Sequence, residues 1–236
     1  QFSASAAHEL RTPLAVMQTN LEVFARREAP ALKDYQEIFA MLQEQTGRLS
    51  HLAEILLDMT GVQTVERSER ISLAALTDEV FCDLASVAEQ KEVELIQQEG
   101  DCIITGSYLL LYRAVYNLVE NAIKYNHSGG KVTVNIHPSE EITDTSTSVN
   151  YVFLEVSDTG IGIPAEQKER IFERFYRVNK SRSKEVGGTG LGLSIVKHAA
   201  RLHSAEIEVQ SELDKGTTIL VIFPKRENRK EKSNDL

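Results

Sequence analysis

The apolar residues of the first 64 positions recur at helical spacing, and this pattern stops where the rest of the chain begins. In residues 2–28 they fall at steps of three and four, which places them on one stripe of a helix. A second run with near-heptad spacing covers residues 34–64, and Pro30 predicts the turn between the two helices. From residue 73 onward, short β-branched segments alternate with helical ones, so we expect an α/β domain after a helical hairpin.

The expected hairpin leaves part of its apolar surface uncovered. Each helix would be roughly 40 Å long at 1.5 Å per residue, and a two-helix hairpin covers only half of each stripe. Pairing with a second copy as a dimeric four-helix bundle covers the remainder, so we expect a homodimer. The alternative is that the stripe packs on the rest of its own chain.

The second part of the chain contains recognisable helix, strand and turn signals. We expect Ser107 to cap a helix that runs to residue 126. The polar stretch 67–72 predicts a linker, 138–150 an exposed loop, and 225–236 a charged disordered tail. The other expected helices cover residues 73–91, 165–172 and 192–203, and the expected strands cover 94–97, 102–105, 131–137, 151–157, 207–211 and 217–223.

Composition excludes several classes of protein. With 35 acidic and 26 basic residues the net charge is −9, which argues against nucleic acid as the main partner. No apolar run approaches the ~20 residues of a membrane span, so we expect no membrane contact within this piece. Cys82 and Cys102 lack CxxC spacing and predict reduced structural thiols. Because the chain begins at Gln1 and a motif follows almost at once, we expect a piece of a longer protein.

Two polar motifs could bind a nucleotide. Asp158 directly follows a strand and opens the stretch Asp158-Thr159-Gly160-Ile161-Gly162. A carboxylate there can accept a hydrogen bond from the exocyclic amine of adenine, while the glycines allow the backbone to approach a flat ring. Asn117 and Asn121 lie four residues apart on one helical face, and an amide oxygen is a suitable Mg²⁺ ligand. Each motif alone could equally be structural.

A third motif is the glycine-rich stretch 187–193, which opens a helix. Free N–H groups at a helix N-terminus favour an anion, although the stretch lacks the lysine of a Walker sequence. The segment before it is basic and resembles a lid over a triphosphate, with Arg177 expected at the terminal phosphate and Tyr176 packed nearby. A solvated loop is the alternative for this segment, which carries Arg174, Arg177, Lys180, Arg182 and Lys184.

A fourth motif lies near the start of the chain and carries a possible phosphate acceptor. In the stretch His8-Glu9-Leu10-Arg11-Thr12-Pro13-Leu14 a histidine stands beside a carboxylate. A neutral imidazole is nucleophilic near pH 7, and the Glu9 carboxylate can stabilise the charge that develops on it. Without the nucleotide motifs, a surface histidine on a bundle helix would be the simpler interpretation.

Taken together in their order along the chain, these motifs resemble the catalytic core of two-component sensor histidine kinases, over about residues 2–224. The stretch from His8 is similar to the H box of that family, and residues 117–121 are similar to its N box. Residues 158–162 and 188–193 are similar to its two G boxes, and residues 171–177 to its F box. The chain departs from the family at His203-Ser204-Ala205, where a His-Gly-Gly turn is common, so this turn is expected to be tighter or differently shaped.

The resemblance implies a fold and a domain plan. Residues 1–66 would form the dimerisation and histidine phosphotransfer domain. Residues 73–224 would form an α/β sandwich ATPase domain of the gyrase–chaperone–kinase (Bergerat) type, with a mixed five-stranded sheet and helices on one face. The piece would be the cytoplasmic portion of a membrane-bound bacterial sensor kinase.

The resemblance also implies roles for individual residues. His8 would accept the phosphoryl group, Glu9 would act as general base, and Thr12 would position water for dephosphorylating a response regulator. Asn121 would ligate Mg²⁺. We further expect Ala15, Thr19 and Asn20 to help recognise the regulator, with ordinary helix surface as the alternative. The implied ATP site comprises Asn117, Asn121, Lys124, Tyr125, Asp158, Gly160, Gly162, Tyr176, Arg177, Gly188, Thr189, Gly190, Leu191, Gly192 and Leu193.

The expected function is ATP-dependent autophosphorylation of His8, followed by transfer to an aspartate of a response regulator. Two alternatives remain at this point. One is a degenerate, dimeric ATP-binding scaffold without kinase activity. The other is an ATPase or serine-directed kinase built on the same nucleotide fold.

Overall fold

The computed structural model describes residues 2–60, 68–139, 151–174, 176–178 and 190–224. Within the helices, the side chains of residues 2–9, 44, 47, 48 and 50–60 lie outside this description. The chain forms two compact units, residues 1–64 and 65–236, which are described separately. The expected loop 140–150 and the expected tail 225–236 both lie outside the described residues.

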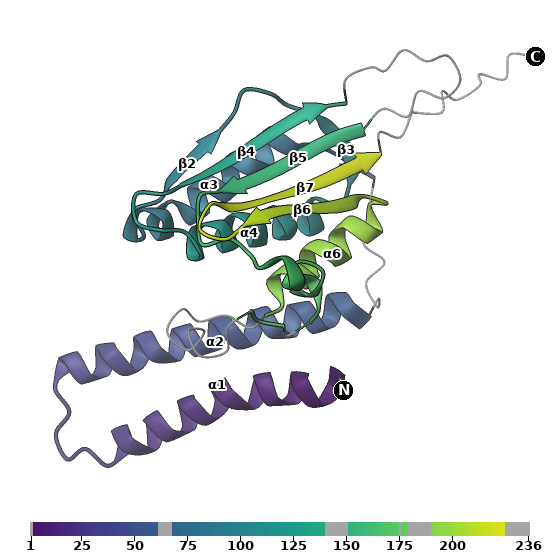
Figure 1. The fold of residues 1–236 in the computed structure, drawn as a ribbon. Coiled ribbons are helices and arrows are strands. Elements are labelled where there is room, and N and C mark those ends of the chain that lie inside the picture. The colour runs from purple at the N-terminus through teal and green to yellow at the C-terminus, as the bar shows by residue number, and fades with distance from the viewer. Residues whose placement is uncertain (1, 61–67, 140–150, 175, 179–189, 225–236) are drawn as a thin grey trace, which may run out of the picture. The chain divides into compact units, whose positions relative to one another are not determined.

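The first unit is a helical hairpin made of α1 (Phe2–Ala25) and α2 (Leu32–Thr60), as predicted (Figure 1). At the turn, Asp34 accepts a 2.8 Å hydrogen bond from the backbone N–H of Ala31 and pairs with Arg27. The hydrogen bond from Ala31 lowers the pKa of the Asp34 carboxyl. Phe24 and Tyr35 pack edge to face across the turn, with ring centroids 5.0 Å apart. These contacts fix α2 to begin at Leu32, two residues earlier than the expected start.

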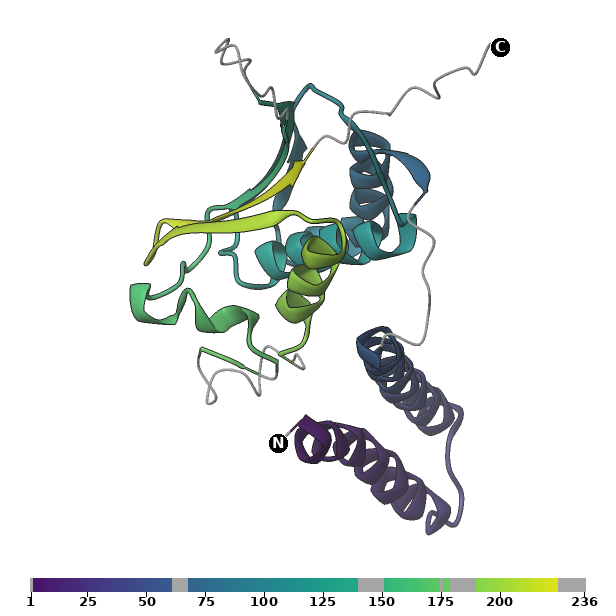
Figure 2. The same ribbon diagram turned by 90° about the vertical axis from the view of Figure 1, so that its right-hand side faces the viewer.

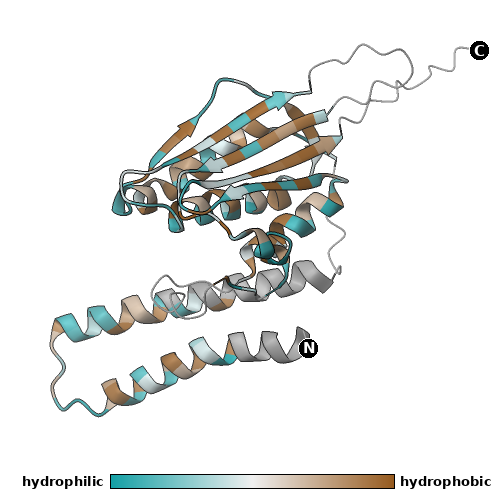
Figure 3. Cartoon of the chain, viewed as in Figure 1, coloured by the Kyte–Doolittle hydropathy of each residue, from teal (hydrophilic) through white to brown (hydrophobic). Residues whose placement is uncertain are grey.

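The hairpin lacks a core of its own. Among the hairpin residues whose side chains the structure describes, only Pro13 and Gln45 are buried in the single chain. Leu14 is 47% exposed and Leu21 43%, although both lie on the predicted stripe, and Phe39 on α2 is 63% exposed. Figure 3 shows apolar residues interspersed along both helices. The uncovered stripe expected from the sequence is therefore present.

The second unit is built on a five-stranded mixed sheet, which confirms the predicted fold. Its strand order is β2-β4-β5-β7-β6, with β2 parallel to β4 and every other pair antiparallel. Val134, Val156, Ile219 and Val209 form one rung across four of these strands. The strands are β2 (Glu94–Gln97), β4 (Lys131–Pro138), β5 (Tyr151–Asp158), β6 (Glu206–Glu212) and β7 (Gly216–Pro224).

Three helices cover one face of this sheet, as predicted (Figure 2). They are α3 (Leu73–Gln90), α4 (Tyr108–Lys124) and α6 (Gly192–Leu202). Alternate strand residues point toward them, so that Val132, Val134 and Ile136 of β4 are each at most 2% exposed. The sheet and these helices thus share one apolar core.

Two tyrosine–carboxylate hydrogen bonds join α3 to α4. The Tyr108 hydroxyl donates to Glu79, and the Tyr112 hydroxyl donates to Asp83. The bond to Glu79 is the main cause that raises the pKa of Tyr108 to about 12, because it favours the protonated phenol. The two rings stack with centroids 6.2 Å apart. These contacts hold the helix that carries Asn117 and Asn121 against its neighbour.

Four local predictions were wrong. Residues 69–72, expected in the linker, form β1 (Glu69–Ser72), which pairs with β3 (Ile103–Gly106) in a separate two-stranded sheet. The strand expected at 102–105 lies one residue later, because β3 pairs with β1 from Ile103 to Gly106. The helix expected at 165–172 is two 3-10 turns, η1 (Ala165–Gln167) and η2 (Arg170–Phe172). The Ser107 side chain makes no cap hydrogen bond to α4.

Candidate functional site: a nucleotide pocket and a phospho-acceptor helix

Asp158 ends β5 and is held by the backbone. Its Oδ1 accepts hydrogen bonds from the N–H of Gly160 at 2.8 Å and from the N–H of Thr217 at 3.2 Å. Burial raises the pKa of the Asp158 carboxyl, and the two backbone hydrogen bonds oppose that rise. Among the described residues, no donor reaches Oδ2. A fixed carboxylate with one oxygen remaining can accept from the exocyclic amine of a base.

Thr217 and Gly216 belong to this site, although neither lies in a predicted nucleotide motif. Gly216 has φ +114°, and a Cβ added to it would lie 1.9 Å from the carbonyl oxygen of Asp158. Only glycine allows β7 to begin this close to the end of β5. No local signal could have shown this, because Asp158 and Thr217 are 59 residues apart in the chain.

The loop after Asp158 is fixed to the end of α4. The N–H of Ile161 donates to the carbonyl of Tyr125 at 3.1 Å, and a Cβ on Gly160 would lie 2.3 Å from that same oxygen. The hydroxyl of Thr159 donates to Oδ1 of the buried Asn126 at 3.2 Å. The predicted residues Gly160 and Tyr125 are therefore in direct proximity.

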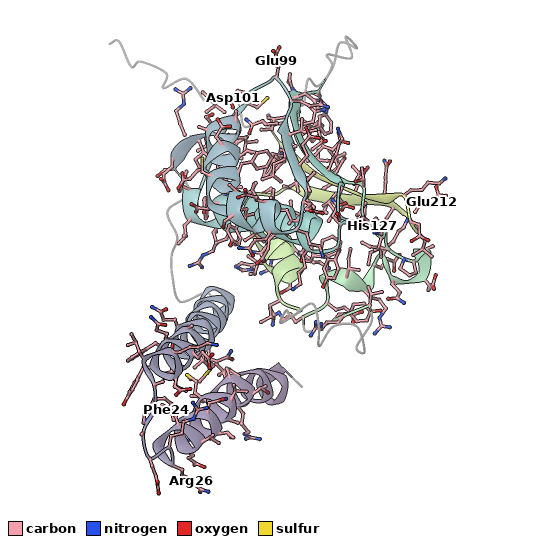
Figure 4. The ribbon with its side chains drawn as sticks, turned by 90° about the vertical axis from the view of Figure 1, so that its left-hand side faces the viewer. Phe24, Arg26, Glu99, Asp101, His127 and Glu212 are labelled. Carbon is pink, nitrogen blue, oxygen red and sulfur yellow. The ribbon has the colours of Figure 1, made fainter. Side chains whose placement is uncertain are left out.

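The same loop is also fixed to the β6–β7 turn. The N–H of Ile163 donates to the Ser211 hydroxyl at 2.8 Å, and the N–H of Asp214 donates to the carbonyl of Ile161 at 3.0 Å. Gly162 adopts φ +67° and has the carbonyl of Glu212 beside it. Figure 4 shows Glu212 and His127 at one end of the sheet and Glu99 at the other. The first glycine motif thus lies between two turns at a single end of the sheet.

Asn117 and Asn121 face the start of α6. Asn117 is 3% exposed, and its Nδ2 donates to the carbonyl of Arg113 at 2.7 Å. A Cβ added to Gly192 would lie 2.6 Å from Asn117 Oδ1 and 3.5 Å from Asn121 Nδ2. Glycine at this position therefore allows the second glycine motif to lie against both predicted amides.

The structure describes only part of the glycine-rich stretch 187–193 that leads into α6. Gly190 has φ +70°, and Leu191 is fully buried. Leu193 packs against the main core. Gly188 and Thr189, as well as Lys180, Arg182 and Lys184 of the expected lid, lie outside the described residues.

Positive charge lies beside the end of α4. The ammonium of Lys124 is 5.8 Å from the ring centroid of Tyr125. Burial raises the pKa of Tyr125, while the positive charge of Arg177 acts to lower it, so Arg177 is within electrostatic range of that phenol. Tyr176 instead packs on η1 and η2, donating to Gln167 at 3.1 Å under the guanidinium of Arg170.

Asp158 lies in the wall of an open polar hollow of about 450 Å³. Thr217 and Ser211 share this wall, and Lys168 and Lys215 add positive charge that the sequence analysis did not single out. Of the described residues, the amides of α4 do not line this hollow. The structure therefore groups the predicted residues into two clusters, one around Asp158 and one around Asn117 and Gly192.

The residues that the structure describes include no cluster of three or more histidine, cysteine or acidic side chains that could hold a metal by itself. Asn121 is partly exposed and offers one hard amide oxygen. Mg²⁺ in ATP sites takes one or two protein ligands and completes its shell with phosphates and water. The donor set at α4 fits a metal that arrives with the nucleotide.

The predicted phospho-acceptor residues lie on α1. The side chains of His8 and Glu9 lie outside the described residues, while Thr12, one turn after His8, is exposed. Ala15, Thr19 and Asn20 are exposed as well, and the Asn20 amide donates to the carbonyl of Val16 at 2.8 Å.

In the part of the chain that the structure describes, no helix has the length and hydropathy of a membrane span.

Comparison with known proteins gives two domain matches. Residues 1–64 match the His Kinase A (phospho-acceptor) domain, and residues 106–227 match the histidine kinase-, DNA gyrase B-, and HSP90-like ATPase. The second match covers more than half of the chain.

Relatives of the whole chain carry the same combination. The sensor histidine kinase RppB of Synechocystis is 35% identical over 95% of this chain, and WalK of Bacillus subtilis is 33% identical over 98%. These alignments cover 48% and 37% of the two relatives, so the chain spans half or less of their length.

A solved structure supports the fold. The histidine kinase AdeS of Acinetobacter baumannii is 18% identical, with a TM-score of 0.68 over 93% of this chain and 98% of that chain. The chain therefore belongs to the two-component sensor histidine kinases, of which it contains the phospho-acceptor and ATPase domains.

Proposed function

We propose that this chain is an ATP-dependent protein-histidine kinase that phosphorylates its own His8. The observation that supports this most strongly is the setting of Asp158. Two backbone N–H groups orient its Oδ1, and Oδ2 is left to accept from adenine. Guanine presents a carbonyl at the corresponding position, so this arrangement selects ATP over GTP.

In the proposed reaction, a ring nitrogen of His8 attacks the γ-phosphorus of ATP. An N–P bond forms, the bond from that phosphorus to the β–γ bridging oxygen breaks, and ADP leaves. Glu9 accepts the proton that the imidazole loses. Lys124 and Arg177 would neutralise charge on the phosphates, and Asn121 would hold the Mg²⁺ that enters with them. Bound Mg²⁺ would supply charge neutralisation on the transferring group.

The ATP-binding residues divide between the two clusters. The cluster of Asp158, Gly160 and Gly162 would hold the base. Asn117, Asn121 and the backbone of Gly190–Gly192 would face the phosphates, because free N–H groups at the start of α6 favour an anion. Tyr125 and Leu193 would support these two parts, and Gly188 and Thr189 would complete the loop.

We also propose that the chain acts as a homodimer through α1 and α2. A hairpin in which Pro13 and Gln45 are the only buried residues among those described needs a second copy to cover Leu14 and Leu21. Sedimentation should give twice the chain mass of 26.4 kDa. Leu21→Glu should shift the protein toward monomer, and Lys33→Glu, at an 83% exposed side chain, should not. A wild-type monomer would contradict this part of the proposal.

The phosphoryl group would then pass to an aspartate of a response regulator. Ala15, Thr19 and Asn20 form an exposed surface below His8 that such a partner could contact. Thr12 would position the water that dephosphorylates the regulator. In the whole protein, this piece would be the cytoplasmic portion of a membrane-bound sensor.

The kinase proposal is tested by incubating the chain with γ-labelled ATP and Mg²⁺. Wild-type protein should become labelled, and His8→Gln should not. Asp158→Asn should be labelled slowly, because its site for adenine is impaired. Nucleotide binding without label in wild-type protein would instead support a non-catalytic scaffold.

A further inference from the structure

His203 lies at the C-terminal end of α6 and is 8% exposed. Its Nδ1 is 2.8 Å from the carbonyl oxygen of Ala199, which can only accept, so Nδ1 carries the proton. Its Nε2 accepts a 3.0 Å hydrogen bond from the backbone N–H of Ser107. The two bonds together require the neutral ring in a single tautomer.

One of the two bonds lies within α6, and the other connects α6 to the start of α4. Ala199 belongs to α6 itself, whereas Ser107 is the residue directly before α4. A Cβ added to Gly106 would lie 2.4 Å from His203 Nε2, so glycine there leaves room for the ring. The ring also meets Phe223 of β7 edge to face, at 6.4 Å between centroids. His203 therefore fixes the end of α6 to the beginning of α4.

The other contacts between α4 and α6 include apolar packing and a close approach. Leu110, Ala114 and Ala199 form a small buried cluster between the two helices, with Leu202 packed against it. At the nucleotide end, Asn117 meets Gly192 by close approach. Apolar burial is not directional, so it leaves the axial position of one helix on the other weakly specified. The bond from Ser107 to His203 is directional and specifies that position.

We propose that His203 is a positioning residue for nucleotide binding. By fixing α6 along α4, it sets the distance between the glycine backbone at 190–192 and the amides of Asn117 and Asn121. It contacts no part of the nucleotide and acts through α6. This inference rests on the proposed ATP site, because that site is what the placement of α6 would serve.

Two conservative substitutions separate the bonds. The terminal amide of His203→Gln can occupy the position of Nε2 and accept from Ser107, which keeps the connection between helices. The shorter amide of His203→Asn can occupy the position of Nδ1 and donate to Ala199, which keeps only the bond within α6. Ile136→Ala, in the core of β4 and 2% exposed, is a matched control for lost stability.

The test measures the dissociation constant of Mg·ADP for the whole 236-residue chain by calorimetry, well below each variant's unfolding temperature. We expect His203→Asn to weaken binding by about tenfold or more, since a misplacement of about 1 Å is costly in such sites. His203→Gln and Ile136→Ala should stay within about twofold of wild type on the same argument.

Three results for the variants would overturn the inference while leaving the proposed ATP site intact. Equal affinity of His203→Asn and wild type would show that the connection does not affect the site. Equal weakening in His203→Asn and Ile136→Ala would show general destabilisation. Failure of His203→Gln to restore binding relative to His203→Asn would show that the bond to Ser107 is not the cause. A wild-type chain that does not bind Mg·ADP would overturn the ATP site itself, and this inference with it.

Discussion

The backbone N–H of Thr217 donates a 3.2 Å hydrogen bond to Oδ1 of Asp158. Thr217 is the second residue of β7 and lies opposite Asp158, the last residue of β5. The N–H of Gly160 reaches the same oxygen. Both donors are main-chain groups, so the carboxylate is oriented without using a side chain. Burial nevertheless raises its pKa, which means that holding the charged carboxylate here costs free energy.

Asp158→Asn should lower ATP affinity by about ten- to a hundredfold, the equivalent of one hydrogen bond to a charged group. The amide can still accept from Gly160 and Thr217, but it cannot present a second anionic oxygen to adenine. Competition with a fluorescent ATP analogue would measure the loss. Glu155→Gln, on the same strand, is the control and should bind as wild type does. Unchanged affinity of Asp158→Asn would remove Asp158 from the site.

The same substitution should stabilise the protein without nucleotide. Because the folded pKa of Asp158 is raised above its ordinary value of 3.8, the folded state binds the proton more tightly. The free energy of unfolding therefore falls as pH rises from 3.8 through the raised pKa, and the loss persists at neutral pH. Asp158→Asn should remove that loss, so its melting temperature at pH 7.5 should exceed that of wild type. A lower melting temperature would contradict the assigned cause.

Gly216→Ala should destabilise the ATPase unit by about 3 kcal/mol or more, because the new Cβ meets the Asp158 carbonyl. Gly129 offers a matched comparison, since it has φ +75° but nothing within 4 Å of an added Cβ. Gly129→Ala should lower the free energy of unfolding by only about 1 kcal/mol, because it adds left-handed backbone strain without a steric clash. Urea titration measures both values, and similar losses would show that the close approach at Gly216 is unimportant.

Ser204 occupies the left-handed region with φ +57°, in the turn where the family resemblance predicts glycine. A non-glycine residue in this region is strained by about 1–2 kcal/mol. Glycine relieves the strain, but it loses more conformational entropy on folding, which offsets part of the stabilisation. Ser204→Gly should therefore raise the free energy of unfolding by about 0.5 kcal/mol. Ser204→Ala should give no gain. Destabilisation by glycine would mean that the serine side chain contributes a contact of its own.

Thr12→Ala should separate two activities. Thr12 is exposed on α1, one turn beyond His8, where its hydroxyl could position water but is not needed for attack on ATP. The rate of autophosphorylation should stay within about twofold, while dephosphorylation of the regulator falls by at least about tenfold, the lower range for losing one catalytic group. Equal loss of both rates would contradict this division.

Local periodicity predicted the hairpin and most of the individual strands and helices, whereas the family resemblance implied the five-stranded sheet with helices on one face. The alternation Val132, Val134, Ile136 marks a strand whatever its neighbours are. The failures lie where pairing partners decide the structure. Residues 69–72 are polar apart from Ile71 and become a strand only by pairing with β3. Residues 165–172 have good helix formers, yet the buried Ile171 and the tertiary setting leave two short turns.

Prediction of the site shows the same division. Asp158, Asn117 and the glycines were identified from motifs, but Thr217 and His203 were not, because their partners lie 59 and 96 residues away in the chain. The roles of His203 and of the Gly216 close approach follow from three-dimensional proximity alone. Such contacts have no signature in a single sequence.

The most direct test of the central claim is the chemical stability of the label that the chain acquires from γ-labelled ATP. A phosphoryl group on a histidine nitrogen is lost in acid and retained in alkali, whereas a phosphoserine shows the reverse. We predict label that is acid-labile, base-stable and absent from His8→Gln, while Asp158→Asn folds and labels slowly. Acid-stable label, or label that persists in His8→Gln, would contradict the assignment of His8 as phosphoryl acceptor.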